Sequence, residues 1–291
     1  MSAQSRLQVM SSILPLNLMV TEIGGDAVDA SLLLPPSVSP HDYQFRPSDI
    51  RRMMGADVFF WVSPELENSL KKLAGKHAAA VSLAPNLARG EDPHVWLDLQ
   101  LVQDMARKIA NTLSRQIPTR GAYFHANAAR FISDLRQYDK SLQAQLQHVP
   151  KFKYLLVHDG FSRFESHYGI GPGKVVMKSE HQLPGARHMA SLREGLLAGE
   201  FTCVFKEPQF PMSRLASLLE GVESQVIELD LLGLKQPAGA YFVDFYQAVG
   251  SSYLKCAAAA GWSSSNWPAG PTRRNLLGGE EDLKRTVKLR S

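Results

Sequence analysis

Three histidines stand in settings that suit metal binding. His41 lies in "SPHDY" beyond an apolar run, His94 lies in "EDPHVWLD" after a loop, and His158 ends the apolar run "YLLVH". Imidazole nitrogens with one carboxylate oxygen form a familiar ligand set for zinc, and Asp230, which ends "VIELD", is the candidate carboxylate. The separations of 53 and 64 residues between the histidines match no local metal motif. From the residues alone, hydrogen-bonded or surface histidines therefore stay an equal alternative.

The elements that must position these residues alternate between apolar runs and segments of helical period. We predict strands at residues 7–13, 28–34, 57–63, 79–84, 153–158, 174–179, 203–207 and 225–230. We predict helices at residues 14–25, 46–56, 64–76, from near 98, and at 160–169, 185–199, 212–222 and 241–259. Such alternation favours an α/β protein whose mainly parallel sheets are covered on both faces. Ligands of such sheets bind beyond the carboxyl ends of the strands, where the histidines and Asp230 are expected.

Residues 118–149 carry one apolar stripe with steps of three and four, which predicts a single long helix. A helix of about 30 residues measures about 45 Å, more than one small lobe needs, so we expect it to link two lobes. The predicted division is an N-terminal α/β lobe at 1–117, the connecting helix at 118–149 and a C-terminal α/β lobe at 150–260. Residues 261–291 are rich in Gly, Ser, Pro and charge, and we expect a disordered tail. We therefore expect a site shared by the histidines to lie between the two lobes.

Composition narrows the class of protein. The chain is 44% hydrophobic and 21% charged, as in ordinary soluble globular proteins, and three of its four net positive charges fall in residues 261–291. This charge distribution argues against nucleic-acid binding. A run of about 18 apolar residues is absent, so we expect no membrane span. The N-terminus shows no signal-peptide pattern, which alone indicates the cytoplasm, whereas a processed chain would lack its signal.

Enzyme motifs give little support for catalysis. The sequence holds neither a Gly-x-Ser-x-Gly elbow nor a phosphate loop. A zinc hydrolase would need an open coordination position and a general base, for which Glu180 and Glu207 can be proposed without positive support. Cys203 and Cys256 have no reactive context, and they can be buried thiols or a disulfide that would persist in an oxidising compartment. We therefore predict that the protein is not an enzyme.

Several segments together resemble one family. The segments "LLPPSVSPHDYQFRPSDIRRMMGADVFFWVSPELE", "DPHVWLD", "VHDGFSRFESHYGI", "GARHMASLREGL", "CVFKEPQF" and "ELDLLG" follow the order and spacing of the zinc-binding periplasmic proteins that serve ABC importers, the ZnuA-like branch of the cluster A-I solute-binding proteins. The resemblance covers about residues 6–258. It implies two lobes joined by one long helix, with the metal between the lobes. It also implies His41, His94 and His158 as ligands, completed by Asp230 or water, and a Cys203–Cys256 disulfide.

The function implied by this resemblance is a monomeric periplasmic receptor with its signal peptide removed. Such a receptor binds one Zn²⁺ per chain and delivers it to the permease and ATPase of an ABC importer, without binding nucleic acid. A manganese or iron receptor of the same fold is the alternative, and a zinc hydrolase is a weaker one. Manganese-binding relatives place a carboxylate where this chain has His158, and an imidazole there favours zinc.

The chain also departs from the family pattern. Many zinc-branch members carry a His- and Asp-rich loop before the second ligand, whereas "APNLARGEDPH" is short. Some members place a glutamate before the first histidine, where this chain has Pro40. That change transfers the fourth-ligand role to Asp230 or to water. We expect Asp42 and Tyr43 to hold the loop of His41 in place.

Overall fold

The N-terminal lobe is built on a four-stranded parallel sheet. The computed structural model describes residues 6–149, 151–177 and 184–262. The strands of this sheet are β1 (Leu7–Ser11), β2 (Val28–Leu32), β3 (Val58–Trp61) and β4 (Ala80–Ser82), in the order β2-β1-β3-β4. Every pair runs parallel. The carboxyl ends of its strands therefore meet at one edge, as the alternation of apolar and helical segments predicts.

The C-terminal lobe repeats this arrangement. Its strands are β5 (Tyr154–His158), β6 (Lys174–Met177), β7 (Cys203–Lys206) and β8 (Gln225–Glu228), in the order β6-β5-β7-β8. All its pairs are parallel as well. The predicted α/β class with two mainly parallel lobes is confirmed.

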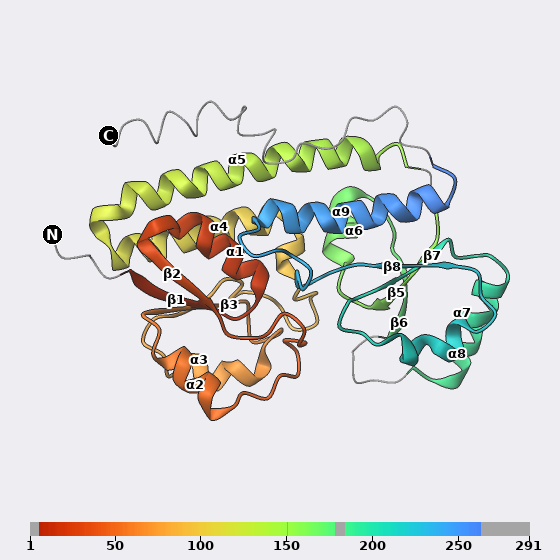
Figure 1. The fold of residues 1–291 in the computed structure, drawn as a ribbon, viewed down its shortest axis with the longest axis horizontal. Coiled ribbons are helices and arrows are strands. Elements are labelled where there is room, and N and C mark those ends of the chain that lie inside the picture. The colour runs from red at the N-terminus through yellow and green to blue at the C-terminus, as the bar shows by residue number, and fades with distance from the viewer. Residues whose placement is uncertain (1–5, 150, 178–183, 263–291) are drawn as a thin grey trace.

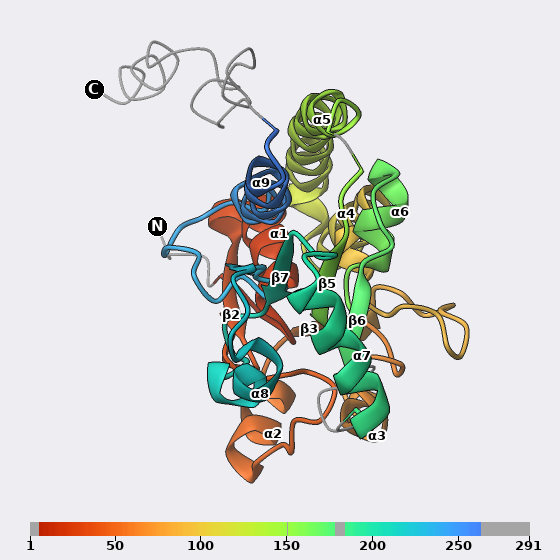
Figure 2. The same ribbon diagram turned by 90° about the vertical axis from the view of Figure 1, so that its right-hand side faces the viewer.

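Helices cover both sheets and connect the lobes. The α-helices are α1 (Leu14–Gly24), α2 (Pro47–Met54), α3 (Lys71–Ala74), α4 (Leu99–Gln116), α5 (Gly121–Leu146), α6 (Ser162–Tyr168), α7 (Ala186–Leu197), α8 (Ala216–Leu219) and α9 (Phe242–Ala259). Short 3-10 helices are η1 (Gly25–Ala27), η2 (Asn68–Leu70), η3 (Val95–Leu97), η4 (Pro118–Arg120) and η5 (Met212–Leu215). Figure 1 shows α5 running over both lobes with α9 beside it, and Figure 2 shows the same pair from the end.

The long connecting helix is present and slightly shorter than predicted. α5 holds 26 residues, which corresponds to about 39 Å. The chain before it forms the 3-10 turn η4 rather than α-helix. The predicted apolar stripe is buried, with Phe131, Leu135, Tyr138 and Leu142 at 5% exposure or less. One face of α5 therefore packs on both lobes.

The predicted helix at 64–76 is shorter than expected, because residues 64–66 form a turn and the helical stretch runs only over residues 68–74. The structure has only η2 and the four-residue α3 there. In the turn before them, the Glu67 carboxylate accepts the backbone N–H groups of Val62 at 2.9 Å and Ser63 at 3.1 Å. These bonds fold the chain back on the end of β3. The predicted helix at 212–222 is likewise reduced to η5 and α8.

The hydrophobic core extends across the predicted lobe boundaries at residues 117 and 149. One buried cluster joins residues of both sheets with α5 and α9, including Phe124, Tyr154 and Tyr246. A second cluster lies in the C-terminal lobe and includes Leu192 of α7 and Leu218 of α8. The division at 117 and 149 stays a prediction, and of the predicted tail, residues 263–291 lie outside the described residues.

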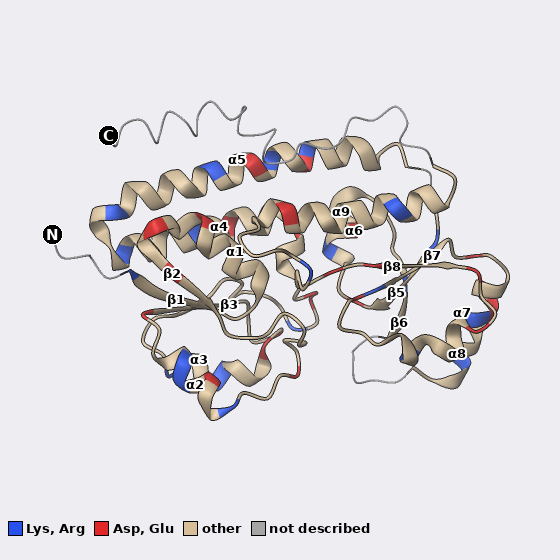
Figure 3. Ribbon diagram, in the orientation of Figure 1, with Lys and Arg blue, Asp and Glu red and all other residues tan. Residues whose placement is uncertain are grey.

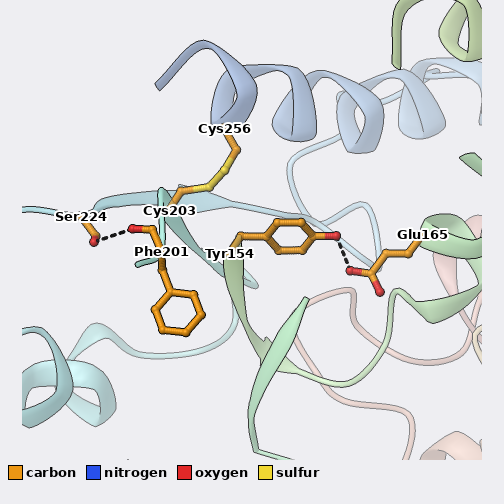
Figure 4. The surroundings of a disulfide bond; sticks show 6 residues. All are labelled: Tyr154, Glu165, Phe201, Cys203, Ser224 and Cys256. Atoms are coloured by element: carbon orange, nitrogen blue, oxygen red, sulfur yellow. Dashed lines mark hydrogen bonds between the residues drawn. A yellow bond between two sulfur atoms is a disulfide. The ribbon is translucent and has the colours of Figure 1, made fainter. Parts of the chain in front are cut away.

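A disulfide joins the C-terminal sheet to the last helix. Cys203 of β7 bonds to Cys256 of α9 with their Cα atoms 5.9 Å apart, which confirms the predicted pair. Figure 4 shows this bond beside Tyr154, whose hydroxyl donates to Glu165 at 2.6 Å.

Among the described helices, none is long and apolar enough to cross a bilayer. Charged residues of both signs follow one another along α5 and α9 (Figure 3).

Candidate metal centre

The structure brings His41, His94 and His158 together at the interface of the two lobes. One ring nitrogen from each lies within 4.8 Å of the others, and Nε2 of His41 lies 3.2 Å from Nε2 of His94. The three ring centroids are 5.2 to 5.6 Å apart. Two nitrogens bound tetrahedrally to one zinc ion lie about 3.3 Å apart, given Zn–N bonds of about 2.0 Å. The spacing therefore suits a single small metal ion.

His158 is the last residue of β5 and is oriented from within its own lobe. Its Nδ1 lies 2.9 Å from Oε1 of Glu207, which directly follows β7. The other oxygen of Glu207 accepts Nε2–H of Gln209 at 2.6 Å. A carboxylate on Nδ1 fixes the tautomer, so that Nε2 is the nitrogen offered to a metal. Glu207, a weak general-base candidate from sequence, is thus a partner of His158.

His94 is oriented by a carboxylate two residues before it. Oδ1 of Asp92 lies 2.5 Å from Nδ1 of His94 and accepts its backbone N–H at 3.0 Å. Burial alone would raise the pKa of Asp92, but the hydrogen bonds and charge of His94 and a hydrogen bond from Ser162 hold it well below its usual range. The Asp92 side chain is therefore a fixed negative charge behind the His94 ring.

The loop of His41 is attached to the N-terminal lobe through Tyr43. The Tyr43 hydroxyl donates to Asp49 of α2 at 2.9 Å, and Ser69 donates to the Tyr43 carbonyl at 3.0 Å. Burial and the Asp49 carboxylate raise the pKa of Tyr43. The predicted holding role is thus supported for Tyr43, and that of Asp42 stays a prediction. His41 is half-buried, whereas the other two histidines are buried, so the site opens on the His41 side.

Asp230 is placed differently from the three histidines. Its Oδ1 accepts the N–H groups of Leu232 at 3.3 Å and Gly233 at 2.8 Å, and its Oδ2 accepts that of Lys235 at 2.9 Å. Within the described ranges, the metal-binding group of three or more side chains is the histidine trio without Asp230. Its role as a ligand stays a prediction. Glu180 lies outside the described residues.

Sequence reasoning missed three contributors to the site. Asp92 and Glu207 were not recognised as partners of the histidines, and Gly160 was not singled out. A Cβ at Gly160 would lie 3.1 Å from Nδ1 of His158 and 3.3 Å from Cε1 of His94. Glycine therefore lets both rings pack on the backbone. The signals were present in the Asp-Pro-His spacing and in a glutamate directly after a strand.

Comparisons with known proteins agree with this geometry. The family model described as "Zinc-uptake complex component A periplasmic" matches residues 9–256. The high-affinity zinc uptake system protein ZnuA of Yersinia pestis is 28% identical over 289 residues, covering 85% of this chain and 90% of its own. The protein of the same name from Haemophilus ducreyi is 27% identical, covering 85% of this chain and 92% of its own.

Solved structures share the fold. A crystal structure of ZnuA superimposes with a TM-score of 0.76 at 24% identity, covering 87% of this chain and 99% of its own. A zinc-bound ZnuA deletion mutant does so with a TM-score of 0.75 at 25% identity, covering 88% of this chain and 98% of its own. The family match extends over most of the chain, through both lobes and all three histidines. The chain belongs to the ZnuA family of zinc-uptake component A proteins.

Proposed function

We propose that this chain is a high-affinity zinc receptor that passes Zn²⁺ to the membrane permease of an ABC importer. It binds one ion through His41, His94 and His158. The observation that carries the proposal is the convergence of three imidazoles, with one ring nitrogen from each within 4.8 Å of the others. The names of the relatives, which describe zinc uptake, support the same role.

The donor set favours zinc over manganese or iron. Three imidazole nitrogens suit zinc, whereas manganese prefers sites rich in carboxylate and water oxygens. The carboxylates of Asp92 and Glu207 bond to the Nδ1 atoms of His94 and His158, so they orient these two rings and are not counted among the metal ligands. A water completes the tetrahedron unless Asp230 releases its three backbone N–H groups, so we propose water as the fourth ligand.

The receptor works as a monomer in the periplasm. The Cys203–Cys256 disulfide supports this location, because such bonds persist in oxidising compartments. Catalysis has no positive support, since Glu207, the candidate base that the structure describes, accepts hydrogen bonds from His158 and Gln209.

Metal binding by chelator-stripped protein tests the proposal. Competition titrations with Zn²⁺ and Mn²⁺ give the affinities, and native mass spectrometry gives the number of ions per chain. We expect one tightly bound zinc and much weaker manganese, with Asp230→Ala retaining the zinc affinity. Tight manganese and weak zinc would favour the alternative metal, and neither metal binding would remove the receptor function.

A further inference from the structure

The segment that carries His94 belongs to the N-terminal half of the sequence but is bonded to the C-terminal half of the molecule. Trp96 donates Nε1–H to the carbonyl of Leu231 at 2.8 Å, and the Tyr246 hydroxyl donates to the carbonyl of Leu97 at 2.9 Å. Trp96 is fully buried in this position. The second histidine of the metal site is therefore held by groups of the C-terminal lobe and α9.

Asp92 makes the most direct of these connections. Its Oδ1 holds the His94 ring, while its Oδ2 accepts the Ser162 hydroxyl at 2.6 Å. Its backbone carbonyl accepts Nε–H of Arg163 at 2.6 Å. A guanidinium nitrogen of Arg163 also lies 3.8 Å from Asp98, the N-cap of α4. One residue thus positions a histidine of the site and bonds to the opposite lobe.

The helix that supplies Ser162 and Arg163 is itself fixed. At the other end of α6, His167 bonds to Asp139 of α5 at 2.7 Å and Tyr168 donates to the same carboxylate at 3.0 Å. The Asp139 carboxylate raises the pKa of His167, because a negative charge favours the imidazolium. α6 therefore cannot follow a movement of the 92–98 segment without breaking bonds at one end.

We propose that Asp92, Ser162 and Arg163 form an interlobe clamp that slows zinc release by keeping His94 in its binding position. This inference rests on the proposed zinc-receptor function and adds two positioning residues, Ser162 and Arg163, that do not touch the metal. The bonds to Ser162 and Arg163 keep Asp92 in place, so that its Oδ1 holds the His94 ring toward the ion, and their loss lets Asp92 and the ring move away together. The clamp therefore acts on the dissociation rate more than on the association rate.

The decisive experiment measures zinc release in Ser162→Ala. Zinc-loaded protein is mixed rapidly with an excess of a chromogenic chelator, and the release rate is read from the colour change. Loss of one hydrogen bond to a carboxylate at this solvent-accessible position is expected to speed release about fivefold. Ser162→Thr keeps the hydroxyl and is expected to release zinc at nearly the wild-type rate. Ser166→Ala, exposed on the same helix, is the matched control and is expected to leave the rate unchanged.

Each outcome separates the clamp from simpler explanations. Wild-type release in Ser162→Ala overturns the clamp, as does equally fast release in the Thr variant or in Ser166→Ala, because helix disturbance then suffices. Failure of the wild-type protein to bind zinc at all overturns the receptor function instead, so the two failures are distinguishable.

A double-mutant cycle identifies Asp92 as the partner. Ser162→Ala is expected to speed release in wild type but to add nothing in an Asp92→Ala background, because the accepting carboxylate has already gone. Arg163→Lys keeps a positive charge near Asp98 yet loses the Nε–H, and we expect it to speed release about threefold, the lower part of the range for one hydrogen bond. Full additivity of the Asp92 and Ser162 changes would overturn the clamp.

Discussion

The two lobes share one strand order but carry different chemistry at the carboxyl ends of their strands. In the C-terminal lobe, β5 ends in His158 and the residue after β7 is its partner Glu207. In the N-terminal lobe, β1 ends at Ser11, and the turn after β3 encloses the buried Glu67. The C-terminal lobe therefore builds its proposed ligand, His158, into the sheet, whereas the proposed ligands His41 and His94 lie on loops.

The difference shows that a parallel sheet brings the carboxyl ends of its strands to one edge. It does not determine which of these strand ends carry metal-binding residues. Glu67 is completely buried, and burial raises its pKa to about 7 despite hydrogen bonds from the backbone N–H groups of Ser63 and Val62. It stabilises a turn at a strand end where a ligand could have stood. The lobes also differ in that Cys203 and Cys256 cross-link the C-terminal one to α9.

Removal of a ligand gives the largest expected effect and tests the comparison directly. We expect His158→Ala and His41→Ala each to weaken zinc binding by on the order of 1,000-fold, more than the 10- to 100-fold typical when a ligand loses its supporting partner. The two variants should differ in the thermal stability of their zinc-free forms. His158→Ala leaves the buried Glu207 without its imidazole, which lowers the melting temperature of zinc-free protein, while the half-buried His41 is replaced with little change.

Competition titrations and thermal unfolding of the two variants measure these effects. His125→Ala, exposed on α5, serves as the control that changes neither quantity. Equal loss of stability in both histidine variants would remove the distinction between a ligand built into a strand and one on a loop.

The disulfide gives the next largest effect. It closes a loop with a sequence separation of 53 residues, which corresponds to about 4 kcal/mol of unfolding free energy on the chain-entropy model. Cys203→Ala/Cys256→Ala should therefore lower the free energy of unfolding in urea by about 2 to 4 kcal/mol. Hydrogen exchange should quicken in β7 and α9 and stay unchanged in β1 and β3. Equal quickening in both sheets would show that the cross-link does not act mainly on its own lobe.

Most of the strands and helices could be predicted from the sequence because they depend on local patterns of apolar residues. Apolar runs identified the strands, and the stripe through Phe131 and Leu142 identified α5. His158 was correctly placed at a strand end, since both the strand and its last residue can be read in order along the chain. The same reading placed His41 and His94 beyond strands, where the structure brings them together.

The remainder depends on contacts between distant residues, which periodicity does not record. The bond of Glu207 to His158 requires β5 and β7 to be neighbours, and that of Asp92 to Ser162 requires the lobes to meet. The helix predicted at 64–76 begins only at Asn68, after a turn in which the Glu67 side chain bonds to backbone groups before it. The apolar pattern is helical from residue 64 onward, so the turn at its start could not be inferred from it.

Because Glu67 is a buried carboxylate, we expect the free energy of unfolding to depend on pH. Glu67 has a pKa of about 7 in the folded protein against 4.5 for an ordinary glutamate. The folded state therefore holds this proton more tightly, and its contribution to stability is complete below about pH 4.5 and lost as the pH rises to about 7. The loss is about 3 kcal/mol, and Glu67→Gln should abolish it because an amide does not ionise.

Free energies of unfolding of zinc-free protein, measured in urea between pH 5 and pH 8, test this expectation. The curve of Glu67→Gln should decline less with rising pH than that of wild type. Glu65→Gln, exposed in the same turn, should follow the wild-type curve. Parallel curves for wild type and Glu67→Gln would mean that Glu67 does not carry the dependence.

The smallest expected effect concerns the carboxylates that accept the Nδ1–H groups of the histidines. It tests whether the two lobes hold their histidines independently. Glu207→Gln keeps an oxygen that can accept the Nδ1–H of His158 but loses the charge, so we expect zinc affinity to fall about tenfold, the low end for such partners. Glu207 acts within its own lobe, whereas Asp92 also bonds across to Ser162. The effects of Glu207→Gln and Ser162→Ala on zinc release should therefore add, because they act through different histidines. Rates for the two single variants and the double variant decide this, and strong coupling would mean that the lobes hold the metal as one unit.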